Sequence, residues 1–304
     1  MNEIPDNYFS NLSSYEEFVI KTNLLGYDVS DNEVLSCFKR VENYYWFVVN
    51  RHLCFLDNKG NKAEDVVING DFDCSNLKLT SLEGCPKEVG KNFDCSLNQL
   101  TSLEGCPKKV GRDFNCDNNH LTSLRGCLNE VGGDFVCAYN HLTSLKGSPK
   151  KIKGSLKCSH NQLISLEGCP KEVGGYFDCS YNKLISLEGC SKEVRGNFYC
   201  DNNHLTSLEG FPKEVKGDFD CSYNQLTSLK GCPEIVGRDF YCSENHLTSL
   251  KGCPKEVGGD FHCVRNKLTS LEGCIEKVGG DFYCYLNRNK LSKPNNLECK
   301  KFYK

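Results

Sequence analysis

The sequence predicts a parallel β solenoid of stacked short turns, preceded by a small α+β cap. The first observation is a period of 21 residues, eleven times over. It is marked by Phe72, Phe93, Phe114, Phe135, Leu156, Phe177, Phe198, Phe219, Phe240, Phe261 and Phe282. The second is an alternation of polar and apolar residues, as in DFDCS at 218–222, which is typical of a short strand with one buried face. Because one such unit cannot bury its apolar face alone, the copies must stack.

The N-terminal segment, residues 1–65, carries no repeat and is predicted to be a small α/β capping domain. Two stretches match the S/T-x-x-E pattern that opens a helix, Ser14 with Glu17 and Ser30 with Glu33. After the second, Val34, Phe38 and Val41 would share one helical face. Residues 44–68 then predict two or three strands, with a turn at DNKG and with Trp46 in the core of the cap. Such a cap would cover the exposed edge of the first turn.

The repeating segment, residues 66–291, resembles the leucine-rich repeat, whose core pattern is L-x-x-L-x-L-x-x-N/C-x-L. In the copy at 217–226 the matching residues are Phe219, Cys221, Asn224 and Leu226. The first position of the pattern is usually Gly here, and a Val one residue earlier, such as Val215, is expected to fill its space. The resemblance implies a parallel β-sheet on a concave face. The rest of each unit contains Gly and Pro corners and no helical pattern, which predicts an extended or irregular convex side.

The short unit, with its GCP turn, looks most like the repeats of bacterial secreted effectors and of similar bacterial or phage-encoded proteins. After the last repeat the register slips, so that Asn287 or Asn289 takes the Asn position. Residues 292–304 are predicted to be a brief C-terminal cap with a basic tail.

The chain has 22 Cys, and the repeat explains where they stand. One Cys per turn falls two places after the marker residue, where the pattern requires a small buried side chain. The second, in the GCP corner, is replaced by Ser148 in one copy and by Phe211 in another. There is no CxxC, and neighbouring Cys fall in different corners of the coil. We therefore expect reduced, packed thiols and neither a disulfide framework nor a metal site.

An Asn five places after each marker, from Asn98 to Asn266, is expected to satisfy backbone groups of the neighbouring turn. His120 and His141 follow this row on adjacent turns, but the same position elsewhere holds Gln or Lys. Exposed loop histidines are therefore favoured over metal ligands.

Composition and charge restrict the kinds of partner that the chain is expected to bind. The formal net charge is −3, the first 25 residues do not match a secretory signal, and the apolar runs are too short to cross a bilayer. These features favour a cytoplasmic protein without a membrane partner. Of the 33 solvent-facing strand positions, thirteen are Asp and only Lys157 is basic. An acidic face disfavours nucleic acid.

Candidate binding residues are those whose type varies between turns, because recurring residues are explained by the coil. Aromatic and acidic side chains gather on the C-terminal turns. The candidates are Tyr199, Tyr241, His262, Tyr283, Tyr285, Asp218, Asp239, Asp260 and Asp281. Tyr is enriched in interface cores. The Asp before each marker has an equally plausible structural interpretation, as an acceptor for backbone N–H groups of the Gly-rich corner.

These observations predict a non-enzymatic scaffold that binds a basic partner protein on its acidic, Tyr-bearing face, with no cofactor. No Ser–His–Asp set, phosphate loop or HExxH is present, and few residues follow the last strand. The resemblance extends the hypothesis to a phage- or effector-like inhibitor of a host factor. The alternative is a structural or surface module that holds a row of Ca²⁺ ions on the Asp stripe.

Overall fold

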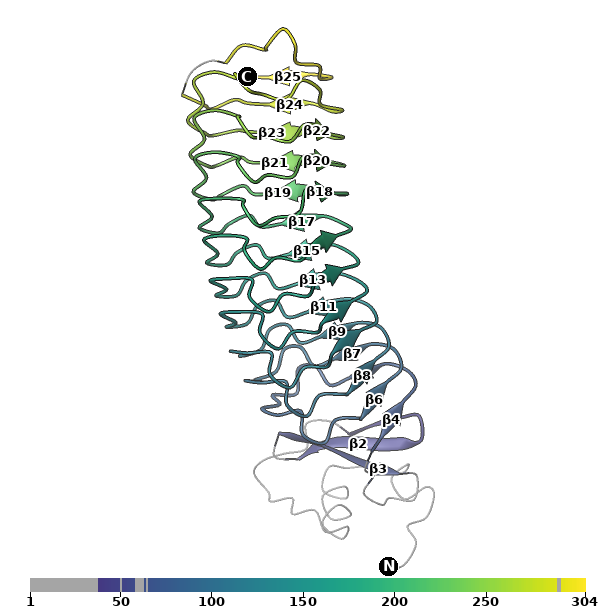
Figure 1. Cartoon of the computed structure of the whole chain (residues 1–304). Helices are drawn as coiled ribbons and strands as arrows, with labels where there is room; N and C mark the ends of the chain where they lie inside the picture. The colour runs from purple at the N-terminus through teal and green to yellow at the C-terminus, as the bar shows by residue number, and fades with distance from the viewer. Residues whose placement is uncertain (1–37, 50, 58–62, 64, 289–290) are drawn as a thin grey trace, which may run out of the picture.

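A computed structural model describes residues 38–49, 51–57, 63, 65–288 and 291–304. It shows a hairpin of three strands followed by a long stack of coils, which bends only gently along its length (Figure 1). Every coil contributes two short strands, one to each of two ladders, except near the C-terminal end. The predicted repeat solenoid is therefore confirmed.

The first ladder is a parallel sheet of twelve strands that runs the whole length of the stack. Eleven of its strands begin at the marker residues and pair in register, so that Phe219 lies beside Phe198 and Phe240, and the twelfth begins at Phe302. They are β5 Phe72–Asp73, β7 Phe93–Asp94, β9 Phe114–Asn115, β11 Phe135–Val136, β13 Leu156–Lys157, β15 Phe177–Asp178, β17 Phe198–Tyr199, β19 Phe219–Asp220, β21 Phe240–Tyr241, β23 Phe261–His262, β24 Phe282–Tyr283 and β25 Phe302–Tyr303. We call the outward side of this sheet the strand face.

The second ladder is formed by the residues just before the Gly-rich corner. The extended backbone predicted for the rest of the turn is present, but here it pairs regularly, which the periodicity of single turns did not indicate. Seven strands form one parallel sheet and three form another. They are β4 Val67–Ile68, β6 Glu88–Val89, β8 Lys109–Val110, β10 Glu130–Val131, β12 Lys151–Ile152, β14 Glu172–Val173 and β16 Glu193–Val194, then β18 Glu214–Val215, β20 Ile235–Val236 and β22 Glu256–Val257.

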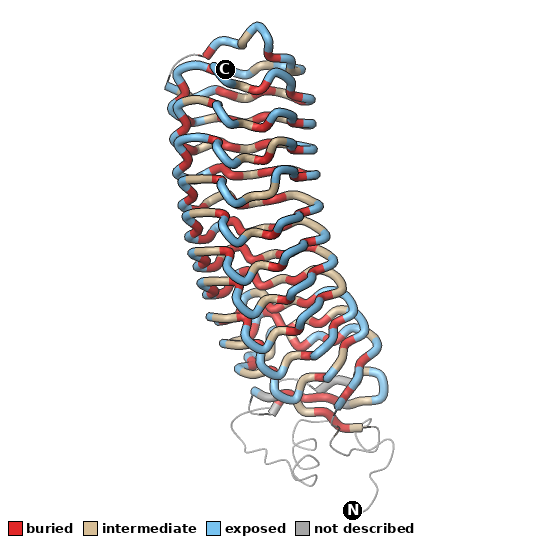
Figure 2. The backbone as a smooth tube through the Cα atoms, viewed as in Figure 1, coloured by how far each residue is buried: buried red, intermediate tan, exposed pale blue. Residues whose placement is uncertain are grey.

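The core is a set of parallel rows, each made of one residue type per turn. Figure 2 shows buried positions recurring at the same places in every coil. The rows hold the marker Phe, the strand Cys, two Leu and the Val before the Gly corner, and nearly all their side chains are fully buried. Val215, for example, is fully buried, which confirms that it fills the space left by the missing first Leu. Stacking of the turns therefore buries the apolar side chains that a single turn would leave exposed.

The thiols follow the packing interpretation. No disulfide joins any of the cysteines in the described part of the chain. The strand Cys221 is fully buried, and its Sγ donates to the carbonyl of Tyr241 on the next turn at 3.3 Å. Burial raises the pKa of this thiol well above its ordinary value, which keeps it protonated and unreactive.

The two corner replacements keep the packing. Ser148 donates its hydroxyl to Gly168 O at 2.7 Å, as Cys106 donates its thiol to Gly126 O at 3.3 Å. The ring of Phe211 packs against two core phenylalanines.

The predicted Asn ladder is present and fully bonded. Each Asn from Asn98 to Asn266 is buried, and Asn224 shows that its partners lie both in its own turn and in the preceding one. The Nδ2 of Asn224 donates to the carbonyls of Cys200, Cys221 and Ser222 at 3.0–3.1 Å, and its Oδ1 accepts the N–H of Leu205 at 2.9 Å. One side chain therefore ties two turns together through four backbone groups.

The N-terminal hairpin corrects one prediction. Phe38–Val41 is not helical but forms β1, which pairs antiparallel with β2 (Tyr44–Val49), and β2 pairs with β3 (His52–Asp57). Strand pairing at this edge outweighs the local helical pattern. The capping boxes at Ser14 and Ser30 and most of the DNKG turn lie outside the described residues.

The hairpin packs against the first turn of the stack. Trp46 is 2% exposed, and its ring lies 5.0 Å from that of Phe72, the first core phenylalanine. At the β1–β2 turn, the Oε1 of Glu42 accepts the N–H groups of Asn69 and Gly70, both at 2.8 Å. Apolar contact and hydrogen bonds together attach the hairpin to the stack.

The C-terminal segment continues the strand face. β25 pairs in parallel with β24 and adds a twelfth strand. Phe302 continues the row of core rings, with its centroid 5.6 Å from that of Phe282. Asn287, of the two candidates, takes the ladder position, since it bonds to the carbonyls of Cys263 and Cys284.

Within the described residues, no helix is long and apolar enough to span a membrane.

Candidate functional site

The Asp row on the strand face forms a hydrogen-bond ladder of its own. The carboxylates before Asp281 accept, through Oδ1, the backbone N–H of the residue at the same place in the next turn. In the C-terminal turns Asp239 N donates to Asp218, Asp260 N to Asp239 and Asp281 N to Asp260, at 2.7–3.2 Å. The donor is thus the next residue of the row rather than the Gly corner, and one oxygen of Asp218, Asp239 and Asp260 has a structural role.

The second carboxylate oxygen is shared with the tyrosines. The hydroxyl of Tyr241 donates to Asp239 Oδ2 at 3.0 Å, and that of Tyr283 donates to Asp281 Oδ2 at 3.3 Å. Burial and the hydrogen bond to Asp239 raise the pKa of the Tyr241 hydroxyl well above its ordinary value of 10. Both phenols are therefore neutral donors at physiological pH, and each is held in one orientation.

Four rings stack along the C-terminal turns, and we call this set the C-terminal column. The centroids of Tyr241 and His262 lie 4.6 Å apart, those of His262 and Tyr283 4.3 Å, and those of Tyr283 and Tyr303 4.6 Å. Burial lowers the pKa of His262, although Asp260 and Asp239 oppose this shift. A neutral imidazole therefore lies between two phenols at neutral pH.

The column includes a residue that the sequence did not indicate. Tyr303 lies outside the 21-residue repeat, and only the formation of β25 places it beside Tyr283. Two predicted site residues lie apart from the column. The ring of Tyr199 contacts that of Tyr176 edge-on, with Asp220 between it and Tyr241 in the sheet, and Tyr285 is a 42% exposed residue beside the sheet.

A second aromatic stack lies at the rim of the strand face, where the chain turns off the sheet; we call it the rim column. It contains Tyr139, His160 and Tyr181, with centroids 4.2 and 4.4 Å apart. All three residues have left-handed backbones, with φ of 50–52°. His160 went unnoticed in the sequence because it differs in type from its neighbours, although it stands in the same 21-residue series.

The N-terminal half of the strand face is partly neutralised. The Nζ of Lys157 lies 3.1 Å from Asp134 Oδ2 and 5.2 Å from the ring centre of Tyr176. Beyond this point the outward strand positions of β15 to β24 hold Asp, Asn, Tyr, His, Ser and Val. Asp218 is paired there with Arg238, whose Nε lies 3.6 Å from its Oδ1, and Lys301 precedes Phe302 in β25. Both halves of the face therefore carry more acidic than basic side chains.

No group of three or more His, Cys, Asp or Glu side chains is placed to hold a metal ion anywhere in the described residues. His120 and His141 stack on each other, with ring centroids 5.8 Å apart. Nothing in this arrangement converges on a common point as ligands of one ion would.

Asp220 carries the most perturbed carboxyl of the acidic face. Its Oδ1 accepts the N–H of Ser222 at 2.8 Å, but burial raises its pKa from 3.8 to about 6, with Asp201 and Asp218 adding to the shift. Burial likewise raises the pKa of Asp201. When Asp220 and Asp201 are ionised, their partly buried negative charges lower the stability of the fold.

Asp220→Asn is therefore expected to stabilise the protein at pH 7.5 by about 1 to 2 kcal/mol. Because the folded state binds this proton more readily, the destabilising effect is absent below pH 3.8 and complete above pH 6. The amide retains the acceptor for Ser222, as Asn115 does at the same position for Asp117. The difference in unfolding free energy between variant and wild type should vanish at pH 3.5.

The control is Asp73→Asn, an exposed residue at the same position that also accepts the N–H group two residues on. It should change stability little at either pH. A stabilisation by Asp220→Asn that is equal at pH 3.5 and 7.5 would contradict the assignment of the effect to the buried charge.

Comparison with known proteins returns only distant structural likenesses. No protein-family model matches the chain, and no curated protein matches it. Among solved structures, YopM from Yersinia enterocolitica WA-314 aligns with a TM-score of 0.45 and 21% identity, over 77% of this chain and 64% of that one. The functional domain of InlJ from Listeria monocytogenes, which includes a cysteine ladder, aligns with a TM-score of 0.40 and 20% identity, over 77% and 62%.

YopM from Yersinia pestis, described as a leucine-rich effector protein, aligns with a TM-score of 0.38 and 19% identity, over 75% and 81% of the two chains. The chain spans less than two thirds of the first two of these structures.

Proposed function

We propose that this chain is a non-enzymatic scaffold that binds a basic partner protein on the C-terminal half of its strand face. The observation that carries the proposal is the C-terminal column, in which four rings stand in a row beside the Asp ladder. Tyr241 and Tyr283 offer ring edges and hydroxyl groups, and Asp239, Asp260 and Asp281 surround them with negative charge.

This surface is preorganised, which favours binding. The rings are held by stacking on each other, and the carboxylates are held by backbone N–H groups of the next turn. A partner therefore need not order these side chains, and little of the binding energy is lost as conformational entropy. Tyr brings large contact area at low entropic cost, which is why it is common among residues that dominate interfaces.

The charge of the face defines the kind of partner. Carboxylates attract Lys and Arg and speed their approach, while they repel the phosphates of nucleic acids. A reducing cytoplasm suits a chain with 22 Cys and no disulfide among those described. The likeness of the repeats to those of bacterial effectors and phage-encoded proteins makes inhibition of a host protein the first activity to examine.

A row of Ca²⁺ ions on the Asp stripe is less well supported. One oxygen of Asp218, Asp239 and Asp260 is already bonded to a backbone amide, and tyrosine hydroxyls approach the second oxygen of Asp239 and Asp281. Thermal melting with millimolar Ca²⁺ separates the two functions, since a loaded module would gain a large stabilisation.

The test is capture of partners from host lysate, followed by measurement of affinity for the captured protein. Tyr241→Ala with Tyr283→Ala should weaken binding by about 2 kcal/mol or more, roughly 30-fold, and should leave the melting temperature nearly unchanged. Asp94→Asn, at the other end of the face, is the control. Equal losses at both ends would replace the discrete site with a diffuse charged surface, and no loss at either would exclude the strand face.

A further inference from the structure

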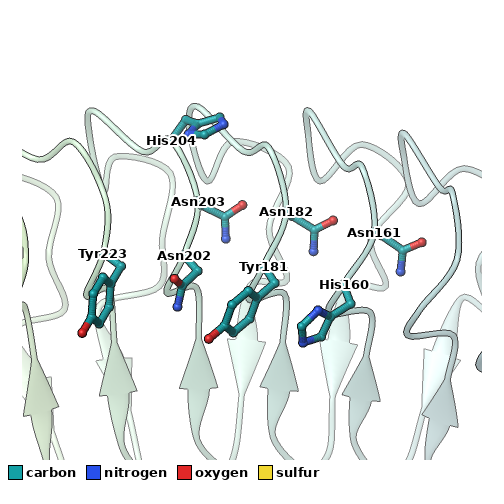
Figure 3. Close-up of a pocket in the computed structure, with 8 residues that line it drawn as sticks. All are labelled: His160, Asn161, Tyr181, Asn182, Asn202, Asn203, His204 and Tyr223. Carbon is teal, nitrogen blue, oxygen red and sulfur yellow. The ribbon is translucent and has the colours of Figure 1, made fainter.

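The rim column is interrupted by one residue. The next turn after Tyr181 carries Asn202 in the same series, and the turn after that carries Tyr223. All of these residues share the left-handed backbone, with φ of 51–53° at Tyr181, Asn202 and Tyr223. The three side chains lie in one row, and the short amide of Asn202 leaves a space between the two rings (Figure 3).

The space has the width of one flat group. Strands of a sheet lie about 4.8 Å apart, so residues two turns apart are separated by about 9.6 Å. The ring of His160 fills the same interval between Tyr139 and Tyr181, at 4.2 and 4.4 Å from its two neighbours. The slot opens into a groove of about 560 Å³ that is lined by Tyr181, Asn202, His204 and Tyr223, among others.

A carboxylate lies next to the slot. The Nδ2 of Asn202 donates to Asp201 Oδ2 at 2.8 Å, and Asp178 on the preceding turn is the strand neighbour of Tyr199, two residues before Asp201. Within the described residues, neither carboxylate forms an ion pair with a basic side chain. Asp201 is half-buried, so a cation that reached it would act in a partly desolvated setting.

We propose that the slot between Tyr181 and Tyr223 binds the guanidinium group of an arginine carried by a partner protein. The guanidinium is planar, stacks on aromatic faces and is more weakly hydrated than an ammonium group. Between two tyrosine rings it would gain cation–π attraction on both sides, and its N–H groups would donate toward Asp201.

One site in the protein already combines a cation over an aromatic ring with an ion pair to a carboxylate. Lys157 lies over the ring of Tyr176 and forms an ion pair with Asp134. A neutral aromatic ring would fit the width of the slot but would leave the carboxylate without a counter-charge. A lysine would supply charge but could not stack as a plate between two rings. Of these three groups, only arginine supplies both a flat surface for stacking and a positive charge.

A small probe tests the slot without knowledge of the partner. The peptide acetyl-Gly-Arg-Gly-amide is titrated into the protein and followed by NMR, with stacking expected to shift its Arg δ-methylene protons upfield. Citrulline, which is flat and neutral, and lysine replace arginine in two further peptides. Both should bind about fivefold to tenfold more weakly.

The decisive variant is Asn202→Tyr, which places a ring of the protein itself in the slot. Tyrosine already occupies this backbone conformation at positions 139, 181 and 223, so the variant should fold with an unchanged or higher melting temperature. Binding of the arginine peptide should fall about tenfold or more. Asn118→Tyr is the control, because Asn118 lies in the same series but follows Leu97 and therefore has a ring on one side only.

Tyr223→Leu removes one wall of the slot and should also weaken binding, which keeps the test decisive if Asn202→Tyr is unstable. Absence of binding to wild type, equal binding of the citrulline peptide, or undiminished binding to Asn202→Tyr would overturn the inference. The inference depends on the proposed function only for the source of the arginine. Tyr241→Ala with Tyr283→Ala should therefore leave peptide binding intact, even if the C-terminal column proves to bind nothing.

Discussion

Asn224→Ala is expected to destabilise the protein by about 3 to 5 kcal/mol, although it removes only a small polar side chain. The amide makes four hydrogen bonds to backbone groups of two turns. Its loss leaves the N–H of Leu205 without this acceptor in a site where Asn224 itself is only 6% exposed. The three carbonyls each lose one of two donors, since they also accept hydrogen bonds from the Asn side chains of neighbouring copies or from a backbone N–H. An unpartnered buried N–H costs about 1 to 3 kcal/mol, and each of the three lost hydrogen bonds costs about 0.5 kcal/mol or more.

The matched control is Gln225→Ala, which removes a larger amide from the next residue, where the side chain is exposed. It should change the free energy of unfolding by less than about 0.5 kcal/mol. Denaturant unfolding followed by circular dichroism compares the two variants. Similar losses for both would mean that the Asn row does not hold the turns together.

Trp46→Ala is expected to open the N-terminal end of the stack at an energetic cost of about 3 to 5 kcal/mol, the usual range for truncation of a buried aromatic residue. The indole contacts Phe72 and stacks on Phe55, with centroids 5.0 and 6.3 Å away. Because each turn contacts only its neighbours, the damage should be local at first. Amide hydrogen exchange should accelerate in β5 and β7 and stay unchanged near β21.

Tyr303→Ala provides the comparison at the opposite end. Its ring is stacked on Tyr283 but is 38% exposed, so its loss should change stability by less than about 1 kcal/mol. Uniform acceleration of exchange along the whole stack in Trp46→Ala would show that the hairpin is coupled to all turns rather than acting as an end cap.

Most of the fold could be predicted because the repeat reduces a three-dimensional problem to one dimension. A residue and its copy 21 positions later are neighbours in space, so the Phe, Cys and Asn rows follow directly from the period. The chemistry of each row then follows from burial, as with the thiol of Cys221 and the amide of Asn224. The predicted thiol packing and Asn ladder agree with the structure for this reason.

The ends of the stack were predicted less well, because no neighbouring copy constrains them. The helical pattern through Val41 gave way to strand pairing with β2, which no local signal revealed. The contribution of β25 was missed for the same reason, since Phe302 falls outside the 21-residue series.

The candidate site was also predicted only in part from the sequence. The sequence by itself determined which side chains face outward on the strand face, that Asp and Tyr stand on its C-terminal turns, and that one Cys of each turn is packed in the core. Only the tertiary structure decided which atoms meet: that Asp218, Asp239 and Asp260 accept the amide of the next copy, that Tyr303 completes the C-terminal column, and that Asn202 leaves a slot between Tyr181 and Tyr223. Backbone periodicity is encoded along the chain, whereas ring stacking and carboxylate bonding depend on side-chain orientation and on strands that the repeat does not contain.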